Sequence, residues 1–168
     1  MLIRKATPAD AEQIADVHVQ SWQTTYRGII ADDYLDRLSV EQRLRNWQWT
    51  FEHMTESDCV FIAEAEDGRI VGLASGGRCR ESDNDFDGEL YAIYLLQHYQ
   101  RRGVGRELFR NVTDFLRQIG CSSMMLWVLA DNPSLTFYLA QGGHITRQQN
   151  IRIGEEELVE LAIGWDYI

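Results

Sequence analysis

The chain has 168 residues and a net charge of −10 at neutral pH, from 26 acidic and 16 basic residues. This length is typical of one domain, so we expect residues 1–168 to form a single folded unit. The acidity disfavours a nucleic-acid-binding surface, which needs clustered positive charge, and leans toward a cationic substrate. The longest apolar runs have about seven residues, against the roughly 20 that span a bilayer. With no signal-peptide pattern at the N-terminus, we expect a cytoplasmic protein without a membrane partner.

The first half of the chain predicts a strand, helical regions and a β-hairpin. Thr7-Pro8-Ala9-Asp10 is typical of a helix start, with Thr7 as N-cap and Pro8 at the first helical position. Asp67-Gly68 is a hairpin turn signal between two apolar segments. The predicted elements of this half are a strand at 2–6, a helix after Pro8, helices at 32–38 and from 40 to about 53, and strands at 60–64 and 70–76.

The second half is organised around an almost wholly apolar segment at 89–96. We place this strand centrally in the sheet, covered on both faces. A strand following a helix favours a crossover connection and a parallel pair. The remaining elements are a polar loop at 81–85, a helix at 104–118, a strand at 124–130, a helix at 133–140 and antiparallel strands at 144–152 and 158–165. This order predicts a mixed α/β fold rather than a doubly wound dinucleotide-binding sheet.

The segment Gln100-Arg-Arg-Gly-Val-Gly-Arg106 lies between the apolar strand and the amphipathic helix. Glycines allow a close approach of the backbone to a ligand. Amide groups at a helix start bind anions, and arginines recognise phosphate groups. The arginines of this region are concentrated within ten residues, although the chain is acidic overall. The loop therefore predicts a pyrophosphate-binding site.

In this setting the chain resembles the GNAT superfamily of acyl-CoA-dependent N-acetyltransferases, from about residue 2 to residue 165. The most specific residues of the resemblance are Gln100, Gly103, Gly105, Asn132 and Tyr138. It implies an acetyl-CoA-dependent N-acetyltransferase with a central, mostly antiparallel sheet of about seven strands and about four flanking helices. It also implies that the loop binds the pyrophosphate of coenzyme A and that the preceding strand binds the pantetheine arm. The implied cofactor-binding residues are Ile93, Tyr94, Leu95, Gln100, Arg101, Arg102, Gly103, Val104, Gly105, Arg106 and Asn132.

Two catalytic residues are expected from this resemblance. Tyr138 corresponds to a tyrosine near the thioester sulfur. Because an ordinary tyrosine has a higher pKa than a thiol, we expect a hydrogen bond to the sulfur rather than full proton transfer. Glu89, eleven residues before Gln100, corresponds to the glutamate that acts as base in the histone-acetylating branch. The alternatives are proton removal through water or backbone, with Glu89 a strand-end residue facing water.

The sequence departs from the family pattern after Tyr138. The spacing from Asn132 to Tyr138 is shorter than usual, and Gly142-Gly143 stands where Gly-Phe is usual. Both departures leave the role of Tyr138 less firmly implied than the role of the loop.

The acceptor side of the site is less well defined by the sequence. Trp22 and Tyr26 border the turn that lines the acceptor cleft in the family, and core packing is the alternative for both. His18 is interpreted as a core histidine, with an acceptor-site residue as the alternative. The acidic loop at 81–87 is interpreted as a solvated loop, with a loop facing a cationic substrate as the alternative. The acceptor amine, on a small molecule or a protein, stays open, as does a homodimer.

Two other classes of function, and a metal site, fit the sequence less well. A non-catalytic acyl-CoA sensor of the same fold would keep the loop, but the pair Glu89 and Tyr138 favours an enzyme. A dinucleotide-binding module fits poorly, because Leu108 stands where a third glycine is expected. Cys59, Cys79 and Cys121 are isolated, and no cluster has metal-ligand spacing, so we expect no metal.

Overall fold

The computed structural model describes residues 1–80 and 85–168, so most of the predicted loop at 81–85 lies outside the described residues. The strands are β1 (Leu2–Lys5), β2 (Asp58–Glu64), β3 (Ile70–Arg78), β4 (Gly88–Leu95), β5 (Met124–Leu129), β6 (His144–Ile153) and β7 (Glu156–Trp165). The helices are α1 (Ala11–Thr25), α2 (Asp32–Asp36), α3 (Val40–His53), α4 (Val104–Gln118) and α5 (Leu135–Ala140), with 3-10 turns η1 (Pro8–Asp10) and η2 (Gln97–Tyr99).

The strands form one seven-stranded sheet of order β1-β2-β3-β4-β5-β7-β6. The predicted mixed α/β sheet is confirmed, with β4 in the middle of the order. Neighbouring strands pair antiparallel except β4 and β5, which are parallel as the crossover through α4 predicts. The parallel pair extends over only two registers, Gly88 with Met124 and Glu89 with Met125. Beyond Glu89 the two strands separate.

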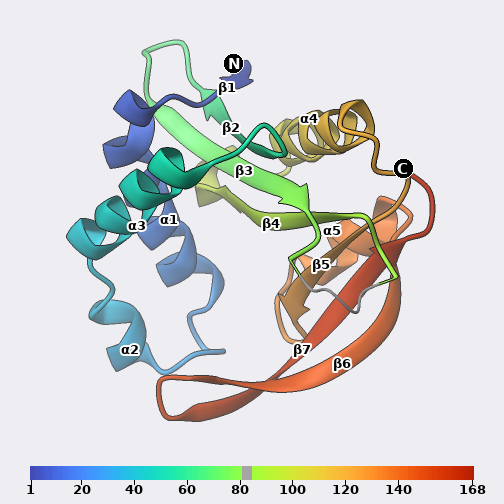
Figure 1. Ribbon diagram of the computed structural model, residues 1–168. Coiled ribbons are helices and arrows are strands. Elements are labelled where there is room, and N and C mark those ends of the chain that lie inside the picture. The colour runs from blue at the N-terminus through green and yellow to red at the C-terminus, as the bar shows by residue number, and fades with distance from the viewer. Residues whose placement is uncertain (81–84) are drawn as a thin grey trace.

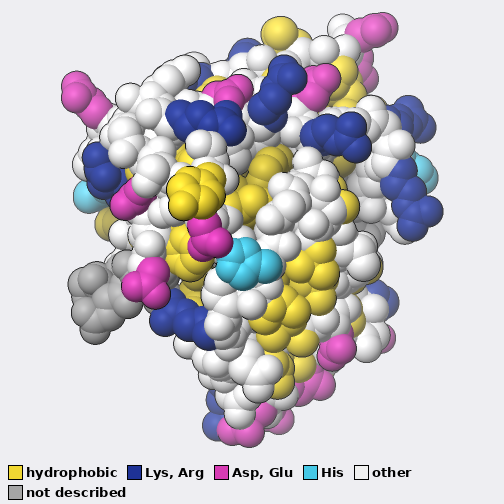
Figure 2. All heavy atoms as spheres, turned by 90° about the vertical axis from the view of Figure 1, so that its right-hand side faces the viewer, with side chains coloured by type: hydrophobic (Ala, Val, Ile, Leu, Met, Phe, Trp, Pro, Cys, Tyr) yellow, Lys and Arg dark blue, Asp and Glu magenta, His cyan; other side chains and the backbone are white. Residues whose placement is uncertain are grey.

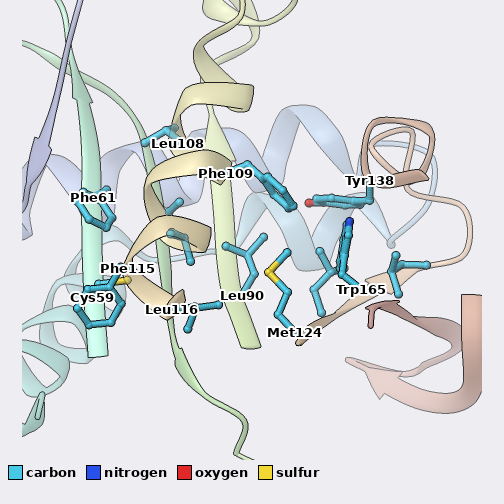
Figure 3. Close-up of a cluster of buried hydrophobic side chains, with 14 of the residues drawn as sticks. Cys59, Phe61, Leu90, Leu108, Phe109, Phe115, Leu116, Met124, Tyr138 and Trp165 are labelled. Atoms are coloured by element: carbon cyan, nitrogen blue, oxygen red, sulfur yellow. The ribbon is translucent and has the colours of Figure 1, made fainter. Parts of the chain in front are cut away.

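Helices cover both faces of the sheet (Figure 1). α1 and α3 pack on one face, where Ile14, Trp47 and Ile62 belong to one buried cluster. α4 packs on the opposite face with Leu108 and Leu116 fully buried, and the α5 residue Tyr138 belongs to the same cluster (Figure 3). The sheet therefore separates the α1 and α3 side of the molecule from the α4 and α5 side. A passage between these two sides requires a gap between neighbouring strands.

A β-bulge at Tyr91 interrupts β4 close to the point where β4 leaves β5. Ala92 pairs with Ser75 and Leu90 with Gly76, so Tyr91 is the extra residue. The glycine is required here, because a Cβ on Gly76 would lie 2.8 Å from the Glu89 carbonyl oxygen and 2.6 Å from a Val112 methyl group. A bulge bends its strand and re-aims the following side chains. The bulge thus helps to turn the second half of β4 away from β5.

The start of the chain is held by a charged network. The Asp10 carboxylate accepts hydrogen bonds from the Thr7 backbone N–H (2.7 Å) and from the Arg4 guanidinium (2.9 Å). Thr7 is a cap as predicted, but the first turn after it is the 3-10 turn η1. The helices predicted at 32–38 and from 40 to about 53 form as α2 and α3, and with α1, α4 and α5 they bring the number of helices to five, close to the about four implied by the resemblance.

The long hairpin of β6 and β7 forms the other edge of the sheet. Figure 2 views the molecule from the right-hand side of Figure 1 and shows apolar side chains among charged ones, with Lys and Arg along the upper edge. Ile145 on β6 is 52% exposed and Leu139 on α5 is 39% exposed. Within the described residues, no helix is long and apolar enough to cross a membrane.

Candidate functional site

A cleft of about 610 Å³ occupies the opening between β4 and β5. Its walls come from five places in the chain: the end of α1, the second half of β4, the loop before α4, the middle of β5, and the segment from Asn132 to Tyr138. This volume is within the range of small-molecule sites, roughly 300–1,000 Å³. The cleft passes between the two faces of the sheet, so ligands bound on opposite faces could meet inside it.

One end of the cleft is lined by the loop that the sequence singles out. Arg101 and Gly103 both have positive φ angles, 59° and 86°, and Arg101 is the one non-glycine residue with this conformation in the part of the chain that the structure describes. Alternating left-handed residues turn successive amides toward one point. The strain of a non-glycine residue in this region persists mostly at functional sites.

The amides of this loop are available to a ligand. Gln100 N–H donates to the Gln97 carbonyl and Glu107 N–H donates to the Gly103 carbonyl, which is the first bond of α4. Between them, the backbone N–H groups of residues 101–106 have no acceptor among the described residues. This set of unpaired donors at a helix N-terminus fits a pyrophosphate, with the positive end of the helix dipole behind it.

Some side chains of the loop line the cleft and others point away from it. Arg101 and Arg106 line the cleft, together with Gln100, whose amide donates to the Leu95 carbonyl at 3.1 Å. Val104 is the first residue of α4 and its side chain is buried in the core, so its backbone alone is available. The Arg102 side chain does not line the cleft but faces the other side of the loop. The sequence could not distinguish these directions, because they follow from the turn at Arg101.

The wall formed by β4 brings Ile93, Tyr94 and Leu95 to the cleft as expected. Leu96 N–H donates to Val71 of β3. Because backbone groups alternate in direction along an antiparallel strand, the N–H groups of Ile93 and Leu95 point away from β3, toward the opening. β4 thus offers backbone donors to a ligand where β5 no longer pairs with it.

Tyr138 reaches the cleft from α5. It is 6% exposed, and its hydroxyl makes no hydrogen bond with any described residue. Burial raises the pKa of Tyr138 well above the ordinary value, and the neighbouring Tyr26 and Tyr94 add to this. Figure 3 shows its ring near Trp165, with the hydroxyl directed to the side of Phe109. A protonated, unpaired hydroxyl at the cleft wall can donate a hydrogen bond to a ligand.

The unusual Gly142-Gly143 pair has a packing reason. A Cβ on Gly143 would lie 2.6 Å from Ile163 and from the Trp165 ring. The indole of Trp165 donates to the Gln141 carbonyl at 3.0 Å and packs 5.4 Å from Phe109. Trp165 therefore fills the space beside the end of α5, and no large residue fits at position 143.

Asn132 and Tyr26 meet across the cleft. The Asn132 amide donates to the Tyr26 hydroxyl at 3.1 Å, and its carbonyl oxygen accepts from Ser134 N–H at 2.8 Å. Burial raises the pKa of Tyr26, so its hydroxyl stays protonated. The end of α1 and the segment after β5 are thus joined by side chains 106 residues apart.

Glu89 does not line the cleft. It is 2% exposed, and its carboxylate accepts from the Arg80 backbone N–H (3.1 Å) and from the Arg80 guanidinium through Nε (3.1 Å) and Nη2. The Arg80 guanidinium lies 4.4 Å from the centre of the Tyr91 ring, and Tyr91 does line the cleft. The structure therefore places a neutralised ion pair behind Tyr91 where the sequence suggested a free carboxylate.

Trp22 and His18 lie behind the cleft wall on α1. The Trp22 indole N–H and His18 Nε2 are buried with no hydrogen-bond acceptor or donor among the described residues. His18 Nδ1 accepts from the Trp47 indole at 3.2 Å, and its ring stacks on Tyr94 with 4.5 Å between centroids. Burial and the nearby Arg43 lower the pKa of His18 to about 3, so it is neutral. This contact pattern is that of a packing histidine.

The sequence did not point to several residues that line the cleft. These include Ser21 and Thr25 on α1, Tyr91 on β4, Trp127 on β5 and Phe137 on α5. Ser21 is 2% exposed, and its hydroxyl has no partner among the described residues. The helical spacing from Ser21 to Thr25 is the one sequence signal that places both on the same face. Among the described residues, no group of three or more His, Cys, Asp or Glu side chains could hold a metal ion.

Comparison with known proteins agrees with this geometry. N-acetyltransferase YuaI of Bacillus subtilis is 41% identical over 163 residues, which cover 97% of this chain and 91% of that protein. Aminoglycoside N(6')-acetyltransferase type 1 of Stenotrophomonas maltophilia is 30% identical over 127 residues, 73% of this chain and 71% of that protein. The crystal structure of the PaiA N-acetyltransferase from Thermoplasma acidophilum, in complex with coenzyme A, superposes with a TM-score of 0.73 at 20% identity, over 99% of this chain and 98% of that one. The sequence model of the acetyltransferase (GNAT) family matches residues 18–142, and the chain belongs to this family of N-acetyltransferases.

Proposed function

We propose that the protein transfers the acetyl group of acetyl-CoA directly to a primary amine, with both substrates bound in the cleft at once. One observation carries the proposal: three sets of groups converge on one cleft. They are the unpaired amides of residues 101–106, the backbone N–H groups on the edge of β4 that faces away from β3, and the Tyr138 hydroxyl. These groups match a pyrophosphate, an extended amide-containing arm and a leaving sulfur, in that order along the cleft.

The acceptor enters from the α1 side of the sheet in this proposal. Tyr26, Tyr91 and Trp127 line that part of the cleft. An acceptor amine on a small molecule or a protein would reach the opening between β4 and β5 from there. The relative from Stenotrophomonas maltophilia is named for acetylation of an aminoglycoside, which supports a small-molecule amine as the first class to test.

Bound acetyl-CoA supplies an acetyl group activated as a thioester. The N–H groups of Ile93 and Leu95 are placed to donate to a developing negative charge on the carbonyl oxygen, and preorganised donors of this kind are often the largest catalytic contribution. The Tyr138 hydroxyl, which keeps its proton because its pKa is raised, donates a hydrogen bond to the departing sulfur. The amine nitrogen forms the C–N bond as the C–S bond breaks. The proton that the nitrogen loses passes through water in the cleft to the departing sulfur, which leaves as the free thiol of coenzyme A.

Glu89 has an indirect role in this mechanism. Its carboxylate is engaged by Arg80, and a direct path from an amine to Glu89 would require Arg80 to move. We therefore assign Glu89 to holding Arg80 against Tyr91, which fixes the cleft wall beside the bulge. It is a positioning residue in this proposal, rather than the base that accepts the amine proton.

The test is the release of free coenzyme A thiol from acetyl-CoA in the presence of a panel of amines: polyamines, amino acids, aminoglycosides and peptides with a free N-terminus. The expected result is amine-dependent release together with an acetylated product detected by mass spectrometry. Tight binding of coenzyme A with no transfer to any amine would instead support a sensor of the same fold.

A matched pair of variants tests the loop. Gly103→Asp places a carboxylate beside the unpaired amides, and we expect coenzyme A binding to be lost. Gly120→Asp introduces the same residue at a glycine with a similar φ, 85° against 86°, at the far end of α4, and we expect normal binding. Equal affinity of the two variants would contradict the assignment of the loop.

A further inference from the structure

A second hollow lies on the opposite side of the loop from the cleft. It has a volume of about 450 Å³ and is bounded by α1, the start of β3 and η2. Thr24 and Gln97 line both the hollow and the cleft, whereas Arg69, Arg102, His98 and Tyr99 line the hollow alone. The loop before α4 therefore has two concave sides, and the hollow is the side toward which Arg102 faces.

The charge in this hollow is positive although the chain carries −10 overall. Arg69 and Arg102 line it, and no acidic residue does. Neither arginine forms an ion pair with a carboxylate of the described residues, whereas Arg4, Arg27, Arg37, Arg80 and Arg117 all do. Two unpaired guanidinium groups around one hollow, on an acidic protein, indicate a site for an anion.

The donors are arranged around Tyr99. Arg69 Nη2 donates to the Tyr99 hydroxyl at 2.8 Å, and the guanidinium carbons of Arg69 and Arg102 each lie 5.9 Å from the centre of its ring. The phenol thus restrains Arg69 while most of its N–H groups stay available. The Gln97 amide adds a neutral donor, whereas the Thr24 hydroxyl already donates to the Gln20 carbonyl at 3.0 Å. The nearby Asp67 carboxylate accepts from the Arg69 backbone N–H at 3.1 Å but does not line the hollow. Guanidinium groups with a neutral donor beside them match phosphate chemistry.

We propose that this hollow binds a phosphomonoester, as a site separate from the amides of residues 101–106. The hollow is larger than a lone phosphate ion, which favours a phosphate carried on an organic group. Two sources share this chemistry. One is the ribose 3′-phosphate of a coenzyme A molecule whose pyrophosphate lies on the other side of the loop; this source rests on the proposed function. The other is an independent phosphorylated small molecule.

Calorimetry with coenzyme A and 3′-dephospho-coenzyme A separates the sources, using the wild type, Arg69→Gln and the control Arg152→Gln. Arg152 is an exposed arginine on β6 that does not line the hollow, so its substitution removes the same charge from another part of the surface. If the 3′-phosphate occupies the hollow, Arg69→Gln weakens coenzyme A binding by about three- to tenfold, the range for an exposed charge-assisted contact. The affinity for 3′-dephospho-coenzyme A then stays within twofold of the wild type, and Arg152→Gln changes neither.

Phosphorus NMR with millimolar inorganic phosphate and glycerol 2-phosphate tests the independent source. The hollow is assigned to a separate ligand if the wild type and Arg152→Gln broaden the phosphorus resonances and Arg69→Gln does not. In that case the affinities of Arg69→Gln for coenzyme A and 3′-dephospho-coenzyme A equal those of the wild type. Tyr99→Phe keeps both charges and checks that the effect is electrostatic; its binding should stay close to that of the wild type. Identical behaviour of Arg69→Gln and Arg152→Gln in every measurement overturns the proposal. A protein that binds no coenzyme A would refute the proposed function. The phosphorus NMR measurements would still show whether the hollow binds a phosphomonoester.

Discussion

Gly103→Ala is the substitution whose effect follows most directly from the loop geometry. Gly103 has a φ of 86°, and a Cβ added to it would have no atom within 4 Å. The change therefore introduces no clash, and its cost is the left-handed backbone of an L-residue, about 1–2 kcal/mol. A smaller unfolded-state entropy offsets roughly 0.4–1 kcal/mol of that. We expect a net cost of about 1 kcal/mol in any state in which the loop keeps this conformation.

Where that cost appears depends on the free protein. If the loop keeps its shape without ligand, the melting temperature falls by about 2–4 °C and the affinity for coenzyme A is unchanged. If the loop relaxes, stability is retained and binding must restore the strained conformation, which weakens the affinity about fivefold. Thermal denaturation and calorimetry on one sample measure both quantities. A Gly103→Ala protein with wild-type stability and wild-type affinity would refute the left-handed conformation on which the anion site depends.

Gly120→Ala is the matched control. Gly120 follows α4 with a φ of 85° and also has no atom within 4 Å of an added Cβ. It should lose about the same stability, since the backbone strain is the same. Its affinity for coenzyme A should not change, because it lies at the opposite end of the helix.

Three further predictions concern side chains around the cleft. Tyr138→Phe should lower kcat by at least about tenfold, which is the low end for loss of a charge-assisted hydrogen bond, and should change the coenzyme A affinity little. If steady-state kinetics give the same kcat for the variant and the wild type, the hydroxyl has no part in the mechanism. Glu89→Gln should lower both kcat and the melting temperature. The fall of the rate at low pH should remain in the pH–rate profile of this variant, and its disappearance would show that Glu89 is the base. Because the pKa of His18 is lowered to about 3 in the folded state, the unfolded chain binds more protons between pH 6.5 and 3. Stability should fall as the pH drops through this range, by at most about 1.4 kcal/mol per unit, and His18→Gln should flatten that slope in denaturant titrations at several pH values.

Much of the fold could be predicted because its signals are local. The Asp-Gly turn, the capping sequence after Thr7 and the apolar segment of β4 each reflect the conformation of a few residues. The crossover through α4 then leaves a parallel pair as the favoured topology. The helical patterns at 32–38 and from 40 to about 53 are local in the same way, and they form as α2 and α3.

The loop was predictable for the same reason, whereas side-chain directions within it were not. Gly103 and the helix start of α4 are readable from sequence, but the left-handed conformation of Arg101 is not, since arginine has no preference for it. The next residue, Arg102, lies with its guanidinium 5.9 Å from the centre of the Tyr99 ring and does not line the cleft. Glu89 shows a similar limit. Its position at the head of an apolar strand indicates burial, yet its partner Arg80 comes from the far side of a loop, and only the folded chain brings the two together.

The cleft itself depends on β4 more than on any single side chain. If β4 paired with β5 along its full length, the N–H groups of Ile93 and Leu95 would be used within the sheet, and no passage would join the two faces. The parallel pair stops at Glu89, and the bulge at Tyr91 follows within two residues. The amides of residues 101–106 then lie at one end of the opening and Tyr138 beside it, although neither is adjacent to Tyr91 in sequence. The position at which two strands stop pairing is therefore what turns a common anion loop into one end of a site that can hold two substrates.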